Sequence, residues 1–395
     1  MLRVLAIFLN HIASTEINVV HPLRTLADAG EITFDVALEE LVTPEQVAAA
    51  DVIVACRNMD PVFRPVFELA RSLGIPWIYD LDDNLWEVPH EEAHEAYYHH
   101  PARQEMLNWM LKNAQCVRVH SPRLIQMVTP YNPNVHLVRA AVDWSLVPPT
   151  LPELPTDHVP IVYATSRRAG DLLFERMKPD LTELLEEYGD RIRLHIMGAE
   201  PGELRRFPQV IVHAYSDDYS TWFRQFTRAG YAIGLAPMLT DNFHECKTDT
   251  KFRDYAAAGA AGIYQDSAVY RASVTDGVTG LLVSGARGSW SAAIQRLTND
   301  RRFLLAIREN ASQVVRTRNS LVQATASWMD DLRAVPARPP TPVFWEPPRW
   351  DFTLSPDSWR IRLRPYARQI LPIRLRVWLR NLILGWQLRG SSNLR

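Results

Sequence analysis

The sequence predicts an α/β protein made of two doubly wound domains that face an interdomain cleft, followed by a helical C-terminal extension. Short apolar runs alternate with helical patterns through both halves, which is typical of parallel strands joined by crossover helices. A length of 395 residues favours two hydrophobic cores over one. Five prolines lie within residues 148–160, where they are incompatible with helices and central strands, so this segment predicts a hinge.

Six strands are expected in each half, each a compact apolar run bounded by polar or turn residues. In the first half they span residues 3–9, 32–38, 51–55, 75–79, 115–119 and 135–138, with amphipathic stretches at 17–29, 61–73 and 102–113. In the second half they span residues 160–164, 191–197, 210–213, 231–236, 261–264 and 280–283. Ligands of such folds bind at the carboxyl ends of the strands, so we expect a ligand cleft between the halves.

These elements predict a first domain at 1–147, the hinge at 148–160, a second domain at 161–315 and a returning helix at 316–335. The remaining residues, 336–395, form a proline-rich segment and then a basic amphipathic tail. From residue 357 onward, arginine interleaves with tryptophan and leucine on a helical period, which is the composition of a helix lying on an anionic membrane surface. The alternative is a C-terminal helix docked on the protein by its apolar face.

The charge balance, 43 basic and 45 acidic residues, argues against a dedicated nucleic-acid binder, and no nucleic-acid partner is expected. The three cysteines, Cys56, Cys116 and Cys246, have no close spacing, so neither a disulfide framework nor a cysteine metal cluster is predicted, and a reducing compartment fits. The apolar run Val4–Leu9 is too short for a signal peptide, and no stretch approaches the roughly 20 apolar residues of a membrane span.

Residues 235–262, LAPMLTDNFHECKTDTKFRDYAAAGAAG, carry the densest group of candidate ligand-binding side chains. They predict a strand end, an irregular loop and a helix that begins near Cys246 or Lys247. The free amides and positive dipole of a helix start favour phosphate, and Lys247 and Lys251 add charge one turn apart on the same face. Asp254, one turn further, is placed to accept hydrogen bonds from ribose hydroxyls.

The alternative interpretation of this segment is structural. Lys247, Lys251, Arg253 and Asp254 also fit a solvated helix face on which the charged side chains form intrahelical ion pairs.

The stretch Lys247–Val283 resembles the donor-binding half of the large retaining GT-B glycosyltransferase family, glycosyl transferases group 1 or family 4-like. That family has a lysine, an acidic residue that opens a small-residue helix ending in glycine, a strand, and a glycine-bounded turn before G-L-L-V. The likeness covers most of residues 160–315 and, more loosely, the first half. It implies two Rossmann-like domains, the first binding an acceptor and the second a nucleotide-sugar donor, with Asp254 on the nucleotide ribose.

The sequence departs from the family pattern at one position. The family has two glutamates separated by seven residues, whereas this chain has Cys246 at the first position and Asp254 at the second. Either the adjacent Glu245 restores a carboxylate near the transferred sugar, or Lys247 has taken over this role.

The family also places basic side chains on the donor phosphates from the loop after the first strand of the second domain. Arg168 or Arg167 resembles that residue; the alternative is a solvated loop. The catalytic candidates are therefore Lys247, Arg168 and Glu245, and the donor-binding candidates are Arg167, Lys251, Asp254, Thr248, Asn242 and Phe243.

In the first half, WIYDLDDNLW places Asp80, Asp82 and Asp83 at a strand end. This spacing suits a divalent metal, but the two-domain pattern fits a metal-independent fold better, so we expect no metal and no cofactor. The aspartates then bind acceptor hydroxyls or cap a turn. The loop after the first strand lacks a glycine-rich dinucleotide signature, which leaves acceptor binding to this domain. The acceptor-binding candidates are His11, Arg57, Asn58, Asp82 and Asp83.

A zinc-protease pattern competes with this interpretation. His90, Glu91 and His94 match two histidines one helical turn apart with a glutamate base between them, and His100 stands where the extended pattern has a third ligand. The glycine that the extended pattern needs is Tyr97 in this chain, which argues against a metal site.

Together these features predict a hexosyltransferase-type glycosyltransferase that moves a sugar from a nucleotide-sugar donor to a glycan, lipid-linked or other hydroxyl acceptor without metal. The resemblance implies retention of configuration and a role in cell-surface polysaccharide or glycoconjugate biosynthesis. We expect a cytoplasmic enzyme, peripheral on the inner face of the cell membrane. The alternatives are a nucleotide-sugar epimerase or hydrolase on the same fold, a non-catalytic sugar-nucleotide-binding protein, and the zinc metalloprotease.

Overall fold

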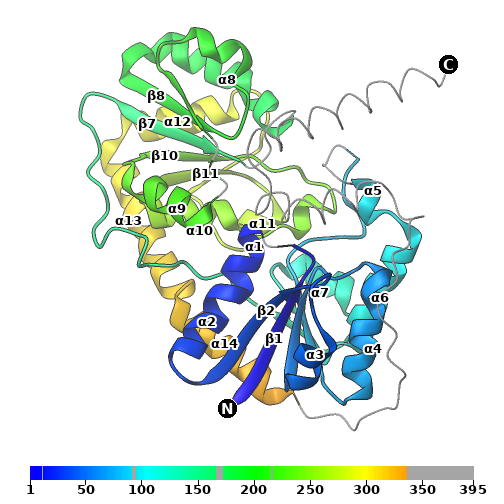
Figure 1. The fold of residues 1–395 in the computed structure, drawn as a ribbon. Coiled ribbons are helices and arrows are strands. Elements are labelled where there is room, and N and C mark those ends of the chain that lie inside the picture. Colours follow the sequence, from blue (N-terminus) through cyan, green and yellow to red (C-terminus); the bar gives the residue numbers. More distant parts are fainter. Residues whose placement is uncertain (11, 91–94, 166–171, 215, 217, 336–395) are drawn as a thin grey trace, which may run out of the picture.

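Two six-stranded parallel β-sheets form the framework of the chain, one in each half, as the sequence predicts (Figure 1). The computed structural model describes residues 1–335 except 11, 91–94, 166–171, 215 and 217. Each sheet has a hydrophobic cluster on both of its faces, formed with the helices that cover it. This is the doubly wound α/β architecture.

The first sheet has the spatial order β2-β1-β3-β4-β5-β6, and the second has the order β12-β11-β10-β7-β8-β9. The strands of the first sheet are β1 (Leu2–Phe8), β2 (Ile32–Leu38), β3 (Val52–Cys56), β4 (Trp77–Leu81), β5 (Cys116–Val119) and β6 (Val135–Leu137). Those of the second are β7 (Val159–Ala164), β8 (Ile192–Met197), β9 (Val210–His213), β10 (Ile233–Ala236), β11 (Ala261–Gln265) and β12 (Leu281–Val283). The strand order reverses between β1 and β3 and between β7 and β10, where doubly wound folds bind ligands.

The expected strands are confirmed, each to within two residues at either end. They could be recognised because strands of a parallel sheet are buried on both faces and therefore read as continuous apolar runs. The burial of every residue of β3 and β4 illustrates this. One boundary shifts, because β7 begins at Val159 and so includes the last two residues of the predicted hinge.

Helices connect the strands. In the first half they are α1 (Ala13–Thr15), the π-helix η1 (Glu16–Val20), α2 (His21–Asp28), α3 (Pro44–Ala49), the 3-10 turn η2 (Pro61–Phe63), α4 (Arg64–Ser72), α5 (Glu95–Tyr98), α6 (Pro101–Asn113) and α7 (Pro122–Val128). In the second half they are α8 (Leu172–Tyr188), the 3-10 turns η3 (Gly189–Arg191), η4 (Gly202–Arg206) and η5 (His244–Cys246), and α9 (Tyr219–Arg228), α10 (Thr250–Ala258), α11 (Ala268–Arg271), α12 (Ser289–Asn299), α13 (Arg301–Arg318) and α14 (Leu321–Ala334).

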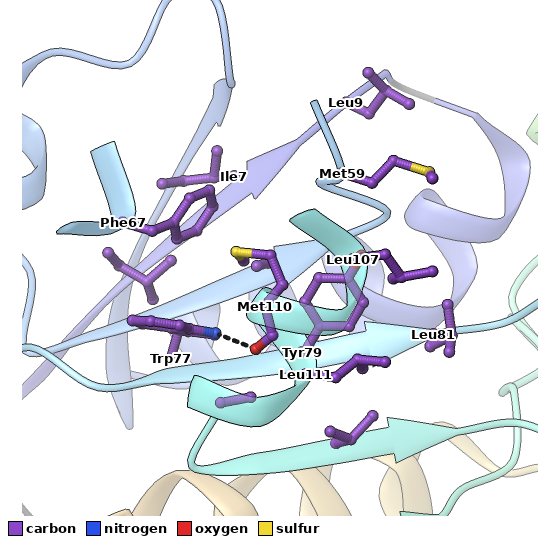
Figure 2. Close-up of a cluster of buried hydrophobic side chains, with 14 of the residues drawn as sticks. Ile7, Leu9, Met59, Phe67, Trp77, Tyr79, Leu81, Leu107, Met110 and Leu111 are labelled. Carbon is purple, nitrogen blue, oxygen red and sulfur yellow. Dashed lines mark hydrogen bonds between the residues drawn. The ribbon is translucent and has the colours of Figure 1, made fainter. Parts of the chain in front are cut away.

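Aromatic packing fixes β4 in the first domain. Trp77 of β4 is fully buried, meets the edge of the Phe67 ring at 5.7 Å between centroids, and donates from Nε1 to the Met110 carbonyl at 3.2 Å (Figure 2). Leu107 and Leu111 of α6 belong to the same cluster (Figure 2). This packing positions the carboxyl end of β4, from which the charged residues described below project.

The last described helix returns to the first domain. Trp328 of α14 is fully buried in the cluster that contains Val4 and Ile78, and its Nε1 donates to the Asn18 carbonyl at 2.9 Å. Figure 1 shows α14 beside α2, while α13 packs on α10 of the second domain. The predicted returning helix, 316–335, is thus the end of α13 followed by α14.

Among the described residues, no helix combines the length and the apolar character that crossing a bilayer requires. The predicted membrane-binding segment, 357–395, lies outside the described residues.

Candidate active site

Charged side chains gather where the strand ends of the two sheets meet. Asp83 follows β4 in the first domain, Lys247 follows η5 in the second, and Lys247 Nζ lies 2.6 Å from Asp83 Oδ2. Ser121, after β5, donates from Oγ to the Cys246 carbonyl at 2.8 Å. These contacts join the domains at the edge where doubly wound sheets bind ligands.

Arg57 holds the carboxylates of the first domain. Its Nε and Nη2 donate to Asp82 at 2.7 and 2.8 Å, and its Nη2 lies 3.8 Å from Asp83 Oδ2. Burial alone would raise the pKa of Asp82, but the charge and hydrogen bonds of Arg57 outweigh burial and lower it. Arg57 has φ +60°, unlike every other described non-glycine residue, and this left-handed conformation costs about 1–2 kcal/mol. The surrounding fold therefore stabilises an unfavourable backbone conformation that aims the guanidinium at both aspartates.

Asn58, also predicted to bind the acceptor, lies beside Arg57 but faces the interior. It is 1% exposed; its Nδ2 donates to Glu39 Oε2 at 2.8 Å, and its Oδ1 accepts from the Cys56 N–H at 2.9 Å. The structure thus brings Arg57, Asp82 and Asp83 together at the boundary. Asn58 is buried instead, and its hydrogen bonds connect the end of β3 with Glu39, which follows β2.

Sequence reasoning missed a second charged group on β4 and β5. His120 Nε2 lies 3.1 Å from both oxygens of the fully buried Asp80, and Arg118 Nε lies 3.8 Å from the same carboxylate. His120 also lies close enough to Asp82 for its charge to lower the pKa of that carboxyl, although less than Arg57 does. His120 directly follows the predicted strand at 115–119, so its strand-end position was the available signal.

The helix expected to begin near Cys246 or Lys247 begins at Thr250. Lys247 is extended, with φ −64° and ψ 160°, and Asp249 is the N-cap of α10. The prediction was wrong because aspartate favours helix starts over helix interiors, and here the Asp249 carboxylate accepts from Ser273 Oγ. Lys247 and Lys251 therefore do not share a helix face, since Lys247 precedes the helix and Lys251 lies in its first turn.

The two lysines have different surroundings. Lys247 Nζ lies 3.9 Å from the centroid of the buried Phe243 ring, and its side chain is 25% exposed at the domain boundary. Lys251 Nζ lies 5.9 Å from the Trp222 ring, within the second domain. Thr248 contacts Thr250 through their hydroxyls, 2.5 Å apart.

Among the described residues, the side chain of the N-cap residue does not cap the amino end of α10. Asp249 makes no cap hydrogen bond to the helix amides and instead accepts from Ser273 Oγ at 2.5 Å. Uncapped amides at a helix start carry the positive end of the helix dipole, which favours an anion.

Asp254 lies inside the second domain. It is 1% exposed, and its Oδ1 accepts from Arg253 Nε at 3.2 Å and Nη2 at 2.9 Å. Burial, together with the negative charge of Asp254, raises the pKa of the neighbouring Tyr219. The alternative of a solvated helix face is therefore wrong for Arg253 and Asp254, which form a buried pair behind the amino end of α10.

The loop before α10 docks on the first domain. Cys246 is fully buried in the core cluster of that domain, where its Sγ lies 3.3 Å from Met127 Sδ of α7 and burial raises its pKa to about 12. Asn242 Oδ1 accepts from Arg123 at 3.4 Å. Glu245 is half-buried at the same boundary. Cys246 therefore packs as an apolar residue and presents no group to a ligand.

Three predicted site residues lie outside the described residues: Arg167, Arg168 and His11. The zinc-protease residues Glu91 and His94 lie outside them as well.

The described histidines of the zinc pattern have other partners. His90 stacks on His99 at 5.5 Å between ring centroids, and its Nδ1 lies 3.4 Å from Glu95. His100 caps α6 by accepting from the Ala102 N–H.

Two cavities lie in the second domain. One, of about 190 Å³, opens at the carboxyl ends of β10, β11 and β12 and is lined by Pro237, Asp266, Ser284 and Arg176. The other, of about 200 Å³, lies beside the hinge. Lys247 lines neither of these cavities.

The boundary group can perform two kinds of chemistry. The Lys247 ammonium and the uncapped amides of α10 can stabilise negative charge, as on a departing diphosphate. Asp82 and Asp83 can accept hydrogen bonds from hydroxyl groups, and the Oδ1 atom of Asp83 is buried without a hydrogen-bond partner among the described residues.

Comparison with known proteins identifies the fold. No family model and no curated protein matches the chain. HepE of Anabaena, solved with UDP and glucose, is 12% identical, with a TM-score of 0.60 over 85% of this chain and 100% of that one. Sucrose-phosphate synthase from Thermosynechococcus elongatus is 14% identical (TM-score 0.59, 84% and 98% covered), and a glycosyltransferase from Rickettsia africae is 11% identical (TM-score 0.55, 84% and 98% covered). The chain has the GT-B fold, as the sequence predicts.

Proposed function

We propose that this GT-B protein is a glycosyltransferase that transfers a sugar from a nucleotide-sugar donor to a hydroxyl acceptor. One observation carries the proposal. Lys247, three residues before the first residue of α10, reaches across the domain boundary to Asp83 at the strand ends of the other sheet. A cation of one domain therefore faces a carboxylate of the other, as we expect where a donor diphosphate and an acceptor hydroxyl meet. Structural neighbours that were solved with UDP or UDP-glucose support this choice of donor.

The donor diphosphate binds at the amino end of α10 in this proposal. The amides of the first turn and the Lys247 ammonium stabilise the negative charge that develops as the nucleoside diphosphate leaves. Arg167 and Arg168, which follow β7 in the chain, are proposed as further phosphate ligands, and no metal is required. In this proposal the phosphate competes with Asp83 for the Lys247 ammonium.

The first domain binds the acceptor in this proposal. Asp83 Oδ1 is buried and unpartnered among the described residues, and a neutral hydroxyl can satisfy it. Arg57 keeps Asp82 ionised and fixed in the same place. We propose a glycan or lipid-linked acceptor in cell-surface polysaccharide or glycoconjugate biosynthesis, and retention of anomeric configuration. The anomeric configuration of the product, followed by NMR from the start of the reaction, tests retention.

Donor binding is measured by thermal shift and calorimetry with UDP, other nucleoside diphosphates and their sugar conjugates. We expect one nucleotide class to stabilise the wild-type chain. Lys247→Ala should weaken its binding about ten- to a hundred-fold, because a charge-assisted hydrogen bond contributes about 1.5–3 kcal/mol. Lys112→Ala, which removes an exposed lysine of α6, is the matched control and should bind as wild type does.

Product analysis separates the competing functions. A glycosylated acceptor together with the released nucleoside diphosphate supports the proposal. An altered or free sugar without a glycosylated acceptor indicates an epimerase or hydrolase, and binding without turnover indicates a non-catalytic protein. Absence of nucleotide binding to the wild-type chain overturns the proposal.

We also propose that residues 357–395 bind an anionic membrane surface, which would place the enzyme on the inner face of the cell membrane. Chains ending at residue 356 should sediment less with vesicles that contain phosphatidylserine and should bind donor as tightly as the full chain. Equal sedimentation of the two chains would disprove the membrane proposal without affecting the donor site.

A further inference from the structure

Three potential metal ligands meet where α14 packs on the sheet of the first domain. Cys116 is the first residue of β5, at the opposite end of that strand from the domain boundary; His136 lies on the neighbouring strand β6, and Asp331 lies on α14. A sulfur, a ring nitrogen and a carboxylate oxygen of these residues all lie within 4.8 Å of one another. Thiolate, imidazole and carboxylate are the ligands that zinc takes in proteins.

Hydrogen bonds fix the orientation of the His136 ring. Asn134 Nδ2 donates to the Gln115 carbonyl at 2.8 Å, so the amide oxygen of Asn134 is the atom that faces His136 Nε2 at 2.9 Å. An amide oxygen only accepts hydrogen bonds, and Nε2 must therefore carry a hydrogen.

This orientation creates a conflict on the other side of the ring. In a neutral imidazole the hydrogen on Nε2 leaves a lone pair on Nδ1, and Nδ1 lies 2.6 Å from Asp331 Oδ1, which also presents a lone pair. Two acceptors at this separation repel each other. A proton between them relieves the repulsion, and so does a metal ion that binds both atoms and draws them apart.

We propose that Cys116, His136 and Asp331 bind one divalent transition metal ion of the zinc class. A proton between His136 and Asp331 would engage only those two groups, whereas a metal would also engage the Cys116 sulfur. Binding Zn²⁺ releases the proton of the Cys116 thiol, because the thiolate is the form that binds the metal.

Residues around the proposed site hydrogen-bond to two of the three ligands and orient them, as residues next to metal ligands do in known metal sites. Arg118 donates to Asp331 Oδ2 and so leaves Oδ1 for the metal, while Asn134 orients the imidazole through Nε2. The His136 side chain is 37% exposed, which gives a water molecule access as a fourth ligand. Tetrahedral zinc, with bonds of about 2.0 Å to nitrogen and oxygen and 2.3 Å to sulfur, requires the separation of His136 Nδ1 and Asp331 Oδ1, 2.6 Å, to open by about 0.7 Å. The widest ligand separation, up to 4.8 Å, must close by about 1 Å.

The site would fasten the returning helix to the sheet of the first domain. Cys116 and His136 belong to that sheet, and Asp331 belongs to the helix that follows the second domain. A metal bound only by the folded chain stabilises it, and metal at a hundred times its Kd shifts the unfolding equilibrium about a hundred-fold. The proposal is independent of the glycosyltransferase assignment, because the metal lies at the other end of β5.

Cobalt substitution tests the site. The full chain is stripped with a chelator, and Co²⁺ is added alone while the ultraviolet and visible spectrum is recorded. We expect one equivalent to produce a thiolate-to-cobalt charge-transfer band together with the visible bands of tetrahedral cobalt. Absence of the charge-transfer band in the wild-type chain overturns the proposal.

Variants assign the ligands. Cys116→Ser should abolish the charge-transfer band, and His136→Asn should weaken Co²⁺ binding at least ten-fold, whereas Cys56→Ala, which changes another buried cysteine of the same domain, should keep both signals. A band that survives in Cys116→Ser overturns the assignment.

A second measurement does not depend on how the variants fold. Zn²⁺ should raise the Tm of the wild-type chain and Mg²⁺ should not, since thiolate and imidazole ligands select transition metals. Equal shifts with the two ions would also contradict the proposal.

Discussion

The side chain of Arg57 combines an unfavourable backbone conformation with a buried ion pair. Removing it by Arg57→Ala leaves Asp82 without its partner and should destabilise the chain by about 3–5 kcal/mol. Arg57→Gly loses the same ion pair but relieves the strain at φ +60°, so it should be about 1 kcal/mol more stable than Arg57→Ala. Urea unfolding of the two variants measures the difference. Equal stability would show that the backbone at this position is not strained.

The same ion pair predicts a pH dependence. Arg57 outweighs burial and lowers the pKa of Asp82, so the folded state binds the proton less readily than the unfolded state. The contribution to stability is then fully present above the unfolded pKa of about 3.9 and is lost as the pH falls below it. Wild-type stability should therefore fall more steeply than that of Arg57→Ala between about pH 5 and pH 3. Parallel urea-unfolding curves for the two chains over this range would contradict the prediction.

His195 on β8 should titrate well below its ordinary range. Burial, with a smaller contribution from His213, lowers the pKa of His195 to about 4, and the two rings stack with Nδ1 of one 2.9 Å from Nε2 of the other. Stability from this group is present above the unfolded pKa of about 6.5 and is lost as the pH falls toward 4. NMR titration of the ring should show a midpoint near 4 for His195. A midpoint near 6.5 would show that the ring is more accessible than the structure indicates.

At the level of elements, α14 buries its largest side chain against the first domain. Trp328 is fully buried, its ring lies under the Arg118 guanidinium at 3.7 Å, and its Nε1 has a backbone partner. Trp328→Ala should destabilise the chain by about 3–5 kcal/mol, since a large cavity and an unpaired carbonyl remain. Val322→Ala, at a side chain of the same helix that is 77% exposed, is the control and should change stability by less than about 0.5 kcal/mol. Similar losses in both variants, measured by urea unfolding, would contradict the described docking of α14.

Elements were more predictable from the sequence than the positions of single side chains. The strands follow from local composition, because runs such as the one that forms β3 are apolar throughout and end at polar residues. The start of α10 cannot be predicted from periodicity. Lys247 and Lys251 have helical spacing, but Asp249 between them occupies the N-cap position, and the helix begins only after it. Whether Asp249 joins the helix or precedes it depends on the hydrogen bonds that its side chain can make in the folded chain. Here the Asp249 carboxylate accepts a hydrogen bond from Ser273.

For the molecule as a whole, the candidate site depends on contacts between residues far apart in the chain. The strand-end rule placed Arg57, Asp82 and Asp83 at one edge, and the structure places them there. No local pattern shows that Cys246 of the second domain packs into the core of the first, or that α14 brings Asp331 to a cysteine and a histidine on neighbouring strands. Those contacts arise only when the two domains and the returning helix assemble.

The ion pair between Lys247 and Asp83 links this assembly to donor binding. In the proposed site Asp83 competes with a phosphate for the Lys247 ammonium, so Asp83→Asn should strengthen binding of the nucleotide sugar. Both side chains are partly exposed, so the ion pair is worth at most about 1 kcal/mol, which corresponds to a Kd about five-fold lower. Asp28→Asn, at an exposed carboxylate in the last turn of α2, should leave the Kd unchanged.

Calorimetry at low and high salt distinguishes this competition from a direct role of Asp83 in holding the donor. If Asp83 only competes, the advantage of Asp83→Asn should shrink as salt screens the ion pair in the wild-type chain. If Asp83 instead positions Lys247 for the phosphate, Asp83→Asn should weaken donor binding in the same direction as Lys247→Ala. The sign of the change in Kd therefore decides whether the contact between the domains opposes or prepares donor binding, because only a competing contact has to break before the diphosphate can occupy the amino end of α10.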